Sequence, residues 1–227
     1  MKITYIHHSS FAVELDNCIL LFDYFKGSLP DFNKNKKLYV FSSHSHHDHF
    51  NKSVFELEKI HPNVTYILSD DIQVTSSKNI NLIGANKKLL VDDLEIETLL
   101  SSDLGVAFIV KVENKTIYHA GDLNWWHWEG ENSPEENAEA EKMFKDSIDK
   151  IEGKNIDLAF IPLDPRQGDY YHLGFDYFMK KTNTKIAVPM HLWGDYSLIK
   201  TFIESEYSLD YKNKIVKINH EGEEFQF

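Results

Sequence analysis

His44-Ser45-His46-His47-Asp48-His49 is the stretch of this sequence that decides the fold. It follows the apolar run 38–41 after two serines, and that run has the composition of a buried strand. Neutral imidazole and carboxylate are common protein ligands of divalent transition metals, and residues two apart in an extended chain face the same side. His44 and His46 can therefore converge on one ion, while a tight turn would bring Asp48 and His49 to a second. We expect His47, which this pattern does not use, to point into solvent.

Length and composition describe an ordinary globular protein. The 227 residues, 42% hydrophobic and 26% charged, suit a single domain over 1–227. The chain has no apolar run of about 18 residues and does not open with a basic-then-apolar leader, so we expect a cytoplasmic protein with no membrane partner. Cys18 is the only cysteine, which excludes an internal disulfide and fits a reducing compartment. A homo-oligomer is compatible with this composition.

The acidic charge balance bears on the partners. The formal net charge is −12, so the chain gains little from counterion release on a phosphate backbone. We therefore expect a small-molecule substrate and no nucleic-acid partner.

Strand patterns dominate the first 120 residues, and strands and helices alternate afterwards. The predicted strands are 2–15 as a pair, 18–22, 64–68, hairpins over 88–100 and 106–119, 156–163, 185–190, 214–219 and 224–227. The predicted helices are 52–60, a short one capped by residues 69–71, 134–151, 173–180 and 197–205. Two sheets packed face to face with helices outside both satisfy this order, so we predict an α/β (α+β) fold arranged as a four-layer αββα sandwich.

Four ligands in six residues cannot close a binuclear site, so distant strand ends must supply the rest. Two stretches fit. The segment 118–122 ends a predicted strand in Gly121-Asp122, and the segment 188–191 ends another in His191. Together with the hexapeptide, in this order, they point to a two-metal centre.

These motifs resemble those of the metallo-β-lactamase superfamily. His-x-His-x-Asp-His is complete at 44–49, Gly121-Asp122 resembles the turn whose carboxylate bridges both metals, and 189–191 resembles the Pro-Met-His element that supplies the last ligand. With the opening stretch 8–11 and the stretch 158–163, the chain looks most like the small lactonase-like branch that includes ascorbate-6-phosphate lactonase. The resemblance implies an αββα sandwich and a metal-dependent hydrolase.

One departure from the family pattern concerns the first metal. Most binuclear members have a histidine between the hexapeptide and the Gly-Asp turn, whereas this chain has none between residues 62 and 118. Either Asp103 serves as an oxygen ligand, or His44, His46 and Asp122 hold the first metal alone. Asp48, His49, Asp122 and His191 would still form the second site. We expect one or two divalent metals per chain, zinc first, with manganese or iron as alternatives.

Several further residues are candidates for substrate contacts. His119 lies three residues before Asp122, so we expect it to support that carboxylate or to contact the substrate as a catalytic residue beside Asp48. Trp125 and Trp126 either line a pocket or pack on the core as a lid. Arg166, in the polar loop 164–171, is a candidate for binding an anionic group, and Tyr171 or His119 for steadying an oxyanion.

The predicted reaction is hydrolysis by a metal-held hydroxide, because metal coordination lowers the pKa of water from about 15.7 to about 7. Asp48 would orient that hydroxide or receive a proton, and the substrate would be a small anionic ester, lactone or phosphodiester. Two alternatives stay open. One is a nuclease or phosphodiesterase of the same superfamily, which the acidic charge disfavours, and the other is a mononuclear or non-catalytic metal-binding protein.

Overall fold

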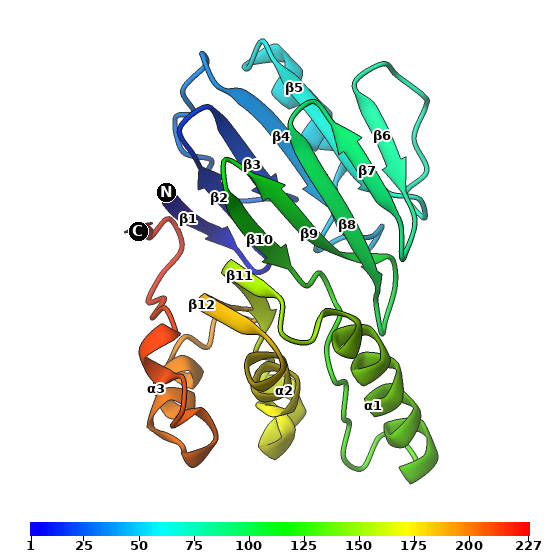
Figure 1. Cartoon of the computed structure of the whole chain (residues 1–227), viewed down its shortest axis with the longest axis vertical. Helices are drawn as coiled ribbons and strands as arrows, with labels where there is room; N and C mark the ends of the chain where they lie inside the picture. The colour runs from blue at the N-terminus through cyan, green and yellow to red at the C-terminus, as the bar shows by residue number, and fades with distance from the viewer.

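Two β-sheets form the centre of the computed structural model, which describes residues 1–227 (Figure 1). The first sheet has the order β13-β1-β2-β3-β4-β5-β6 and the second β12-β11-β10-β9-β8-β7. The strands of the first sheet are β1 (Lys2–His7), β2 (Ser10–Glu14), β3 (Cys18–Phe22), β4 (Lys37–Ser42), β5 (Val64–Ser69), β6 (Ile80–Ile83) and β13 (Glu224–Gln226). The strands of the second sheet are β7 (Lys88–Val91), β8 (Leu94–Leu100), β9 (Val106–Val112), β10 (Lys115–His119), β11 (Asn155–Pro162) and β12 (Asn183–Met190).

Alternation along β3 shows how the first sheet is buried on both faces. Leu20 and Phe22 belong to the main core between the sheets, whereas Ile19 and Leu21 belong to a smaller cluster on the outer face. All five residues of β3 are buried, as expected for a continuous apolar run that alternates between two covered faces. The residues of this stretch therefore contribute to two separate cores.

Helices cover the outer faces of the two sheets unequally. The three α-helices, α1 (Pro134–Ile148), α2 (Leu173–Lys181) and α3 (Ser197–Glu204), lie on the same side of the molecule (Figure 1). Helices α1 and α2 contact the second sheet, and α3 packs on α2 through Phe202 and Phe175. A capping box between Ser133 and Glu136 fixes the start of α1. The first sheet is covered by the 3₁₀ helix η1 (Lys52–Lys59) through Val54 and Leu57. The predicted four-layer sandwich is confirmed, with one thin outer layer.

Two local predictions are wrong. The predicted helix over 52–60 forms, as the 3₁₀ helix η1, but no helix follows β5. Asp71 does not cap a helix, because its carboxylate accepts the backbone N–H of Ser45 at 2.8 Å. The segment 214–219 is no strand, because only Ile215 forms a bridge, to Ala187, while its apolar side chains fill the core. None of the helices has both the length and the hydropathy to span a membrane.

Strand direction positions the metal-binding motifs. The strand β4 runs parallel to its neighbours β3 and β5, and β11 runs parallel to β10 and β12. The carboxyl ends of adjacent parallel strands meet at the same edge of a sheet. The loops after β3, β4, β10, β11 and β12 therefore gather at one end of the sandwich.

Candidate metal centre

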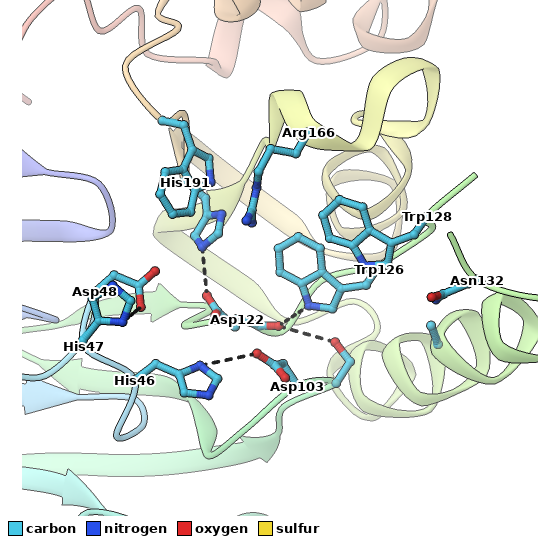
Figure 2. Close-up of a pocket in the computed structure, with 13 residues that line it drawn as sticks. His46, His47, Asp48, Asp103, Asp122, Trp126, Trp128, Asn132, Arg166 and His191 are labelled. Atoms are coloured by element: carbon cyan, nitrogen blue, oxygen red, sulfur yellow. Dashed lines mark hydrogen bonds and ion pairs between the residues drawn. The ribbon is translucent and has the colours of Figure 1, made fainter. Parts of the chain in front are cut away.

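The first cluster of metal-binding side chains forms where the loop after β4 meets the turn after β8. His44 is buried, its Nε2 lies 3.4 Å from Asp122 Oδ2, and its Nδ1 is 3.0 Å from Ser43 Oγ. His46 Nδ1 lies 3.7 Å from Asp103 Oδ2 (Figure 2). One ligand atom from each of His44, His46, Asp103 and Asp122 lies within 4.8 Å of every other. Asp103 thus occupies the neighbourhood where the sequence lacks a histidine.

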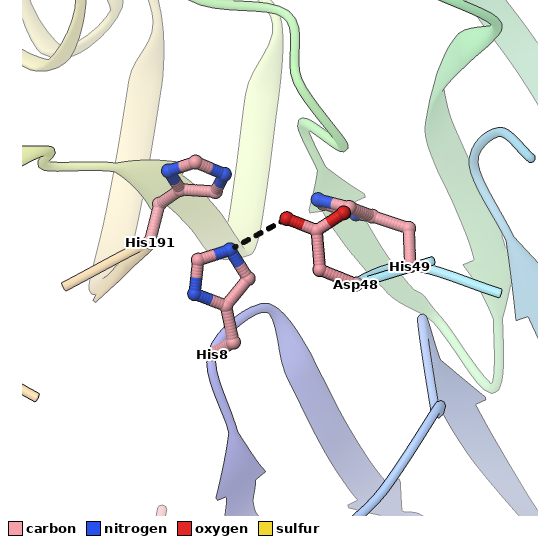
Figure 3. Close-up of side chains that lie close together, drawn as sticks. All are labelled: His8, Asp48, His49 and His191. Carbon is pink, nitrogen blue, oxygen red and sulfur yellow. Dashed lines mark ion pairs between the residues drawn. The ribbon is translucent and has the colours of Figure 1, made fainter. Parts of the chain in front are cut away.

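The second cluster consists of His8, Asp48, His49 and His191, whose ligand atoms also lie within 4.8 Å of one another (Figure 3). Asp122 connects it to the first cluster. Its Oδ1 is 3.0 Å from His49 Nε2 and 3.4 Å from His191 Nε2. Asp122 therefore faces both clusters, each through a different carboxylate oxygen.

Unpartnered buried atoms show that these residues fit divalent metals. Most polar atoms in a protein interior form hydrogen bonds. Here, several atoms that point into the two clusters form none. They are the Nε2 atoms of His8, His44 and His191, whereas His49 Nε2 meets only Asp122 Oδ1, at 3.0 Å. Imidazole nitrogens and carboxylate oxygens that converge without hydrogen-bond partners are the donor set of a transition-metal site.

Two carboxylates behind the clusters orient the histidines, and both were missed from the sequence. Asp23, fully buried, accepts hydrogen bonds at 2.7 Å from His49 Nδ1, from the Ser43 N–H and from Ser43 Oγ. Asp164, also fully buried, lies 2.8 Å from His191 Nδ1. A carboxylate on the far nitrogen fixes the tautomer that leaves Nε2 free for metal. Their position just beyond the ends of β3 and β11 is the one signal that the sequence offered.

The protonation states differ among the histidines. Burial lowers the pKa of His44 to about 4, so its ring is neutral at pH 7. Burial also disfavours the charged form of His49, but Asp122 and Asp23 together raise its pKa well above the ordinary value. Burial also acts on Asp122, but His49 and His191 outweigh it and hold the pKa of that carboxyl well below its usual range. The metal-free centre therefore keeps a proton on His49 between two carboxylates.

A cavity of about 620 Å³ opens onto the clusters (Figure 2). Trp126 and Trp128 stack at 5.7 Å beside it, and the Trp126 indole N–H donates to the Asp122 carbonyl at 2.9 Å. The Arg166 guanidinium lies 4.4 Å from the ring of Trp193 and 5.5 Å from that of Trp128. The lining residues are His46, His47, Asp48, Ser102, Asp103, Asp122, Trp126, Trp128, Asn132, Ala140, Arg166, His191 and Trp193. His47 sits at the rim with its side chain almost fully exposed, as predicted.

Three of the candidates for substrate contacts, His119, Trp125 and Tyr171, do not line this cavity. His119 Nε2 donates to the Ser9 carbonyl at 2.9 Å, and its Nδ1 accepts the Gly121 N–H at 3.1 Å, so it supports the Asp122 turn from behind. Trp125 points away from the cavity because its ring covers the ammonium of Lys145 at 4.2 Å. Tyr171 packs against the main core. The sequence could not distinguish these directions, because neighbouring residues of an irregular loop follow no fixed period.

Comparison with known proteins also supports a metal centre in this chain. Residues 2–126 match the model of the beta-lactamase superfamily domain. A UPF0173 metal-dependent hydrolase of Nanoarchaeum equitans is 28% identical over 218 residues, covering 88% of this chain and 87% of the relative. Igni18, a metallo hydrolase from Ignicoccus hospitalis, has a TM-score of 0.67 at 19% identity and covers 100% of this chain and 98% of its own. The metallo-beta-lactamase fold protein YhfI from Bacillus subtilis has a TM-score of 0.67 at 16% identity, with coverages of 99% and 98%.

The structural similarities and the family model support different conclusions. The two solved structures are similar in fold and confirm the predicted sandwich. The family model spans more than half of the chain and includes the hexapeptide and Asp122. The lactonase-like branch stays a prediction.

Proposed function

Because this chain belongs to the metallo-β-lactamase superfamily, it is a metal-dependent hydrolase, and we propose that its substrate is a small anionic ester, lactone or phosphodiester. The observation that carries this proposal is the pair of His/Asp clusters, joined by Asp122, at the wall of one cavity. A cavity of this volume lies within the range of about 300 to 1,000 Å³ typical of small-molecule sites.

The metal-binding roles follow from the two clusters. His44, His46, Asp103 and Asp122 would hold one divalent ion, and Asp48, His49, His191 and Asp122 a second. A divalent metal bound there lowers the pKa of water from about 15.7 to about 7 and thereby supplies a nucleophile at neutral pH. Zinc suits the imidazole and carboxylate donors, and manganese and iron accept the same set. Neither cluster includes a thiolate.

Asp48 would accept a proton in this reaction. Its side chain is 18% exposed, lines the cavity, and has Oδ2 3.6 Å from His8 Nε2. Neither oxygen accepts a hydrogen bond from another side chain at normal distance, since the other contact, from His47 Nδ1 to Oδ1, is 3.9 Å. Asp48 therefore keeps acceptor capacity toward the cavity. His119, by contrast, contributes only by holding the Gly121-Asp122 turn.

The charge of the cavity favours an anionic substrate. Two divalent ions would carry four positive charges against the three carboxylates Asp48, Asp103 and Asp122. Arg166 and Asp164 neutralise each other, through contacts from Nε at 3.0 Å and from Nη2 at 2.6 Å. Asp23, which holds His49 from behind, would bring the loaded site close to neutral overall, so the preference for an anion would come from the metal ions at the cavity wall and from Arg166. Arg166 also keeps Nη1 free of any protein hydrogen bond, which suits a carboxylate or phosphate oxygen.

The indole rings at the cavity wall add a preference for an apolar group. Trp126, Trp128 and Trp193 line the same cavity as the metal-binding side chains. Aromatic walls with a few placed polar groups are typical of small-molecule sites.

A nucleic-acid substrate is less well supported, because the net charge of −12 opposes binding to a polyanion. We further propose a cytoplasmic location, since the single cysteine fits a reducing compartment.

Metal analysis combined with hydrolysis assays tests this proposal. We expect about two metals per chain in the wild type and about one in Asp103→Ala or in His191→Ala. His47→Ala, at the exposed rim, is the matched control and should keep both metals. The loaded protein should hydrolyse anionic esters, lactones or phosphodiesters faster than neutral analogues, and Asp48→Ala should abolish this. A protein that binds metal yet hydrolyses none of these compounds would contradict the proposed reaction.

A further inference from the structure

We propose that His8, in the turn between β1 and β2, is a direct ligand of the second metal. This inference rests on the proposed metal centre and adds a ligand to it. The His8 side chain is 4% exposed, and its Nε2 has no hydrogen-bond partner. Its ring points at Asp48 and His191 from the side opposite His49 (Figure 3). A ligand atom of His8 lies within 4.8 Å of those of Asp48, His49 and His191, the separation expected of groups that share one ion.

The backbone around His8 is fixed in an uncommon conformation. His8 has φ 52° and His191 has φ 65°, both in the left-handed region. The Tyr5 hydroxyl accepts the His8 N–H at 3.0 Å, and the His8 carbonyl accepts the His191 N–H at 3.4 Å. Non-glycine residues keep such backbone angles only where the surrounding structure enforces them, often at functional sites. The two turns are therefore locked to each other with both rings facing the same point.

Packing or hydrogen bonding alone does not account for the His8 ring. It contacts His191 at 4.1 Å and Trp193 at 4.6 Å between ring centroids, which explains its burial. Its Nε2, however, is 3.6 Å from the nearest carboxylate oxygen, on Asp48, beyond a normal hydrogen bond. A buried polar atom without a partner is costly, and a metal ion between Nε2 and Oδ2 would satisfy both atoms.

This ligand would make the two metal sites unequal. The second site would gain a nearly buried imidazole, whereas the His46 and Asp103 side chains of the first cluster are 47% and 46% exposed. More protein ligands and less solvent access slow the loss of a metal. We therefore expect a chelator to remove the first metal before the second.

The test compares two histidine-to-asparagine variants. Asparagine tolerates the left-handed backbone at residue 8 but cannot reach the cluster. His61→Asn is the matched control, because His61 is also buried with an unpartnered Nε2 but belongs to neither cluster. By chelator competition, His8→Asn should raise the dissociation constant of the second metal by at least about tenfold. His61→Asn should leave it unchanged.

A second measurement uses the wild-type protein and needs no variant to fold. In cadmium-loaded protein with nitrogen-labelled histidines, NMR should show a coupling between cadmium and Nε2 of His8. Absence of that coupling, or an unchanged dissociation constant in His8→Asn, would overturn the assignment of His8 while leaving the metal centre intact. If the wild type holds no second metal, as judged against His191→Ala, the proposed function fails as well.

Discussion

Asp23→Asn should damage the second metal site although Asp23 does not face the cavity. In the wild type, Oδ1 accepts the Ser43 N–H, and Oδ2 accepts both Ser43 Oγ–H and His49 Nδ1–H. Asparagine keeps the shape but replaces one acceptor oxygen with an NH₂ donor. If that donor faced the Ser43 N–H, two donors would meet. If it faced His49 Nδ1, the ring would have to carry its proton on Nε2, which then could not bind metal.

The magnitude follows from the loss of this orientation. Removing a group that orients a metal ligand typically weakens metal binding about 10- to 100-fold, which corresponds to about 1.4 to 2.8 kcal/mol. The metal-free protein should also lose about 1 to 3 kcal/mol of unfolding free energy, because a fully buried hydrogen-bonding group is left mismatched. Both changes should be measurable separately.

The assays are chelator competition for metal affinity and urea denaturation of the metal-free protein. Asp157→Asn is the matched control, because Asp157 also accepts a backbone N–H, from Thr116 at 2.9 Å, but lies away from the clusters. Wild-type affinity for the second metal in Asp23→Asn would refute the argument that Asp23 sets the His49 tautomer. Equal loss of affinity in Asp157→Asn would show that the effect is not specific to the site.

Three further predictions follow from the same geometry. Gly105→Ala should lower the unfolding free energy by more than backbone strain alone, which costs about 1 to 3 kcal/mol, because a Cβ there would lie 2.6 Å from His44 Cβ and still closer to the Ser43 carbonyl. Gly153→Ala, at a similar positive φ but with open space around it, measures the strain alone in urea denaturation. Equal losses of unfolding free energy in the two variants would contradict the close approach at Gly105. Metal affinity, measured by titration calorimetry, should fall as pH drops through the raised pKa of His49, because the proton competes with the metal. In the metal-free protein, the stabilisation by protonated His49 is complete below its ordinary pKa and should decline as pH rises through the raised pKa. If neither metal affinity nor stability changed with pH, His49 would not be protonated. Arg166→Met should raise KM for anionic substrates roughly 5- to 10-fold, a modest effect because the guanidinium is half exposed, and an equal rise for neutral analogues would argue against charge recognition.

The ligands that the sequence identified share one property: each is marked by its immediate neighbours. His44 and His46 follow an apolar strand at alternating positions, and Asp122 and His191 lie just after the ends of β10 and β12. Because the carboxyl ends of neighbouring parallel strands meet, strand-end residues in one sheet can be expected to approach one another. Fold class and most of the two clusters could be predicted on that basis.

The choice at Asp103 needed the structure. The sequence left open whether this residue serves as a ligand or lies in an ordinary turn. In the folded chain, its carboxylate lies in the first cluster, 3.7 Å from His46. The turn at Gly105 brings this loop to the site. It can approach His44 so closely only because glycine has no Cβ.

Sequence alone determined the alternation that buries each strand, the succession of most strands and helices along the chain, and the motifs that carry metal-binding side chains. Tertiary structure alone decided that His8, Asp23 and Asp164 join them, and that His119, Trp125 and Tyr171 do not face the cavity. The physical reason is the distance along the chain between the residues that meet. Periodicity between neighbouring residues fixes which face of a strand is buried, but which remote turn meets which depends on how the two sheets pack. The His8 turn and the His191 turn, 183 residues apart, meet only because β1 and β12 lie in facing sheets.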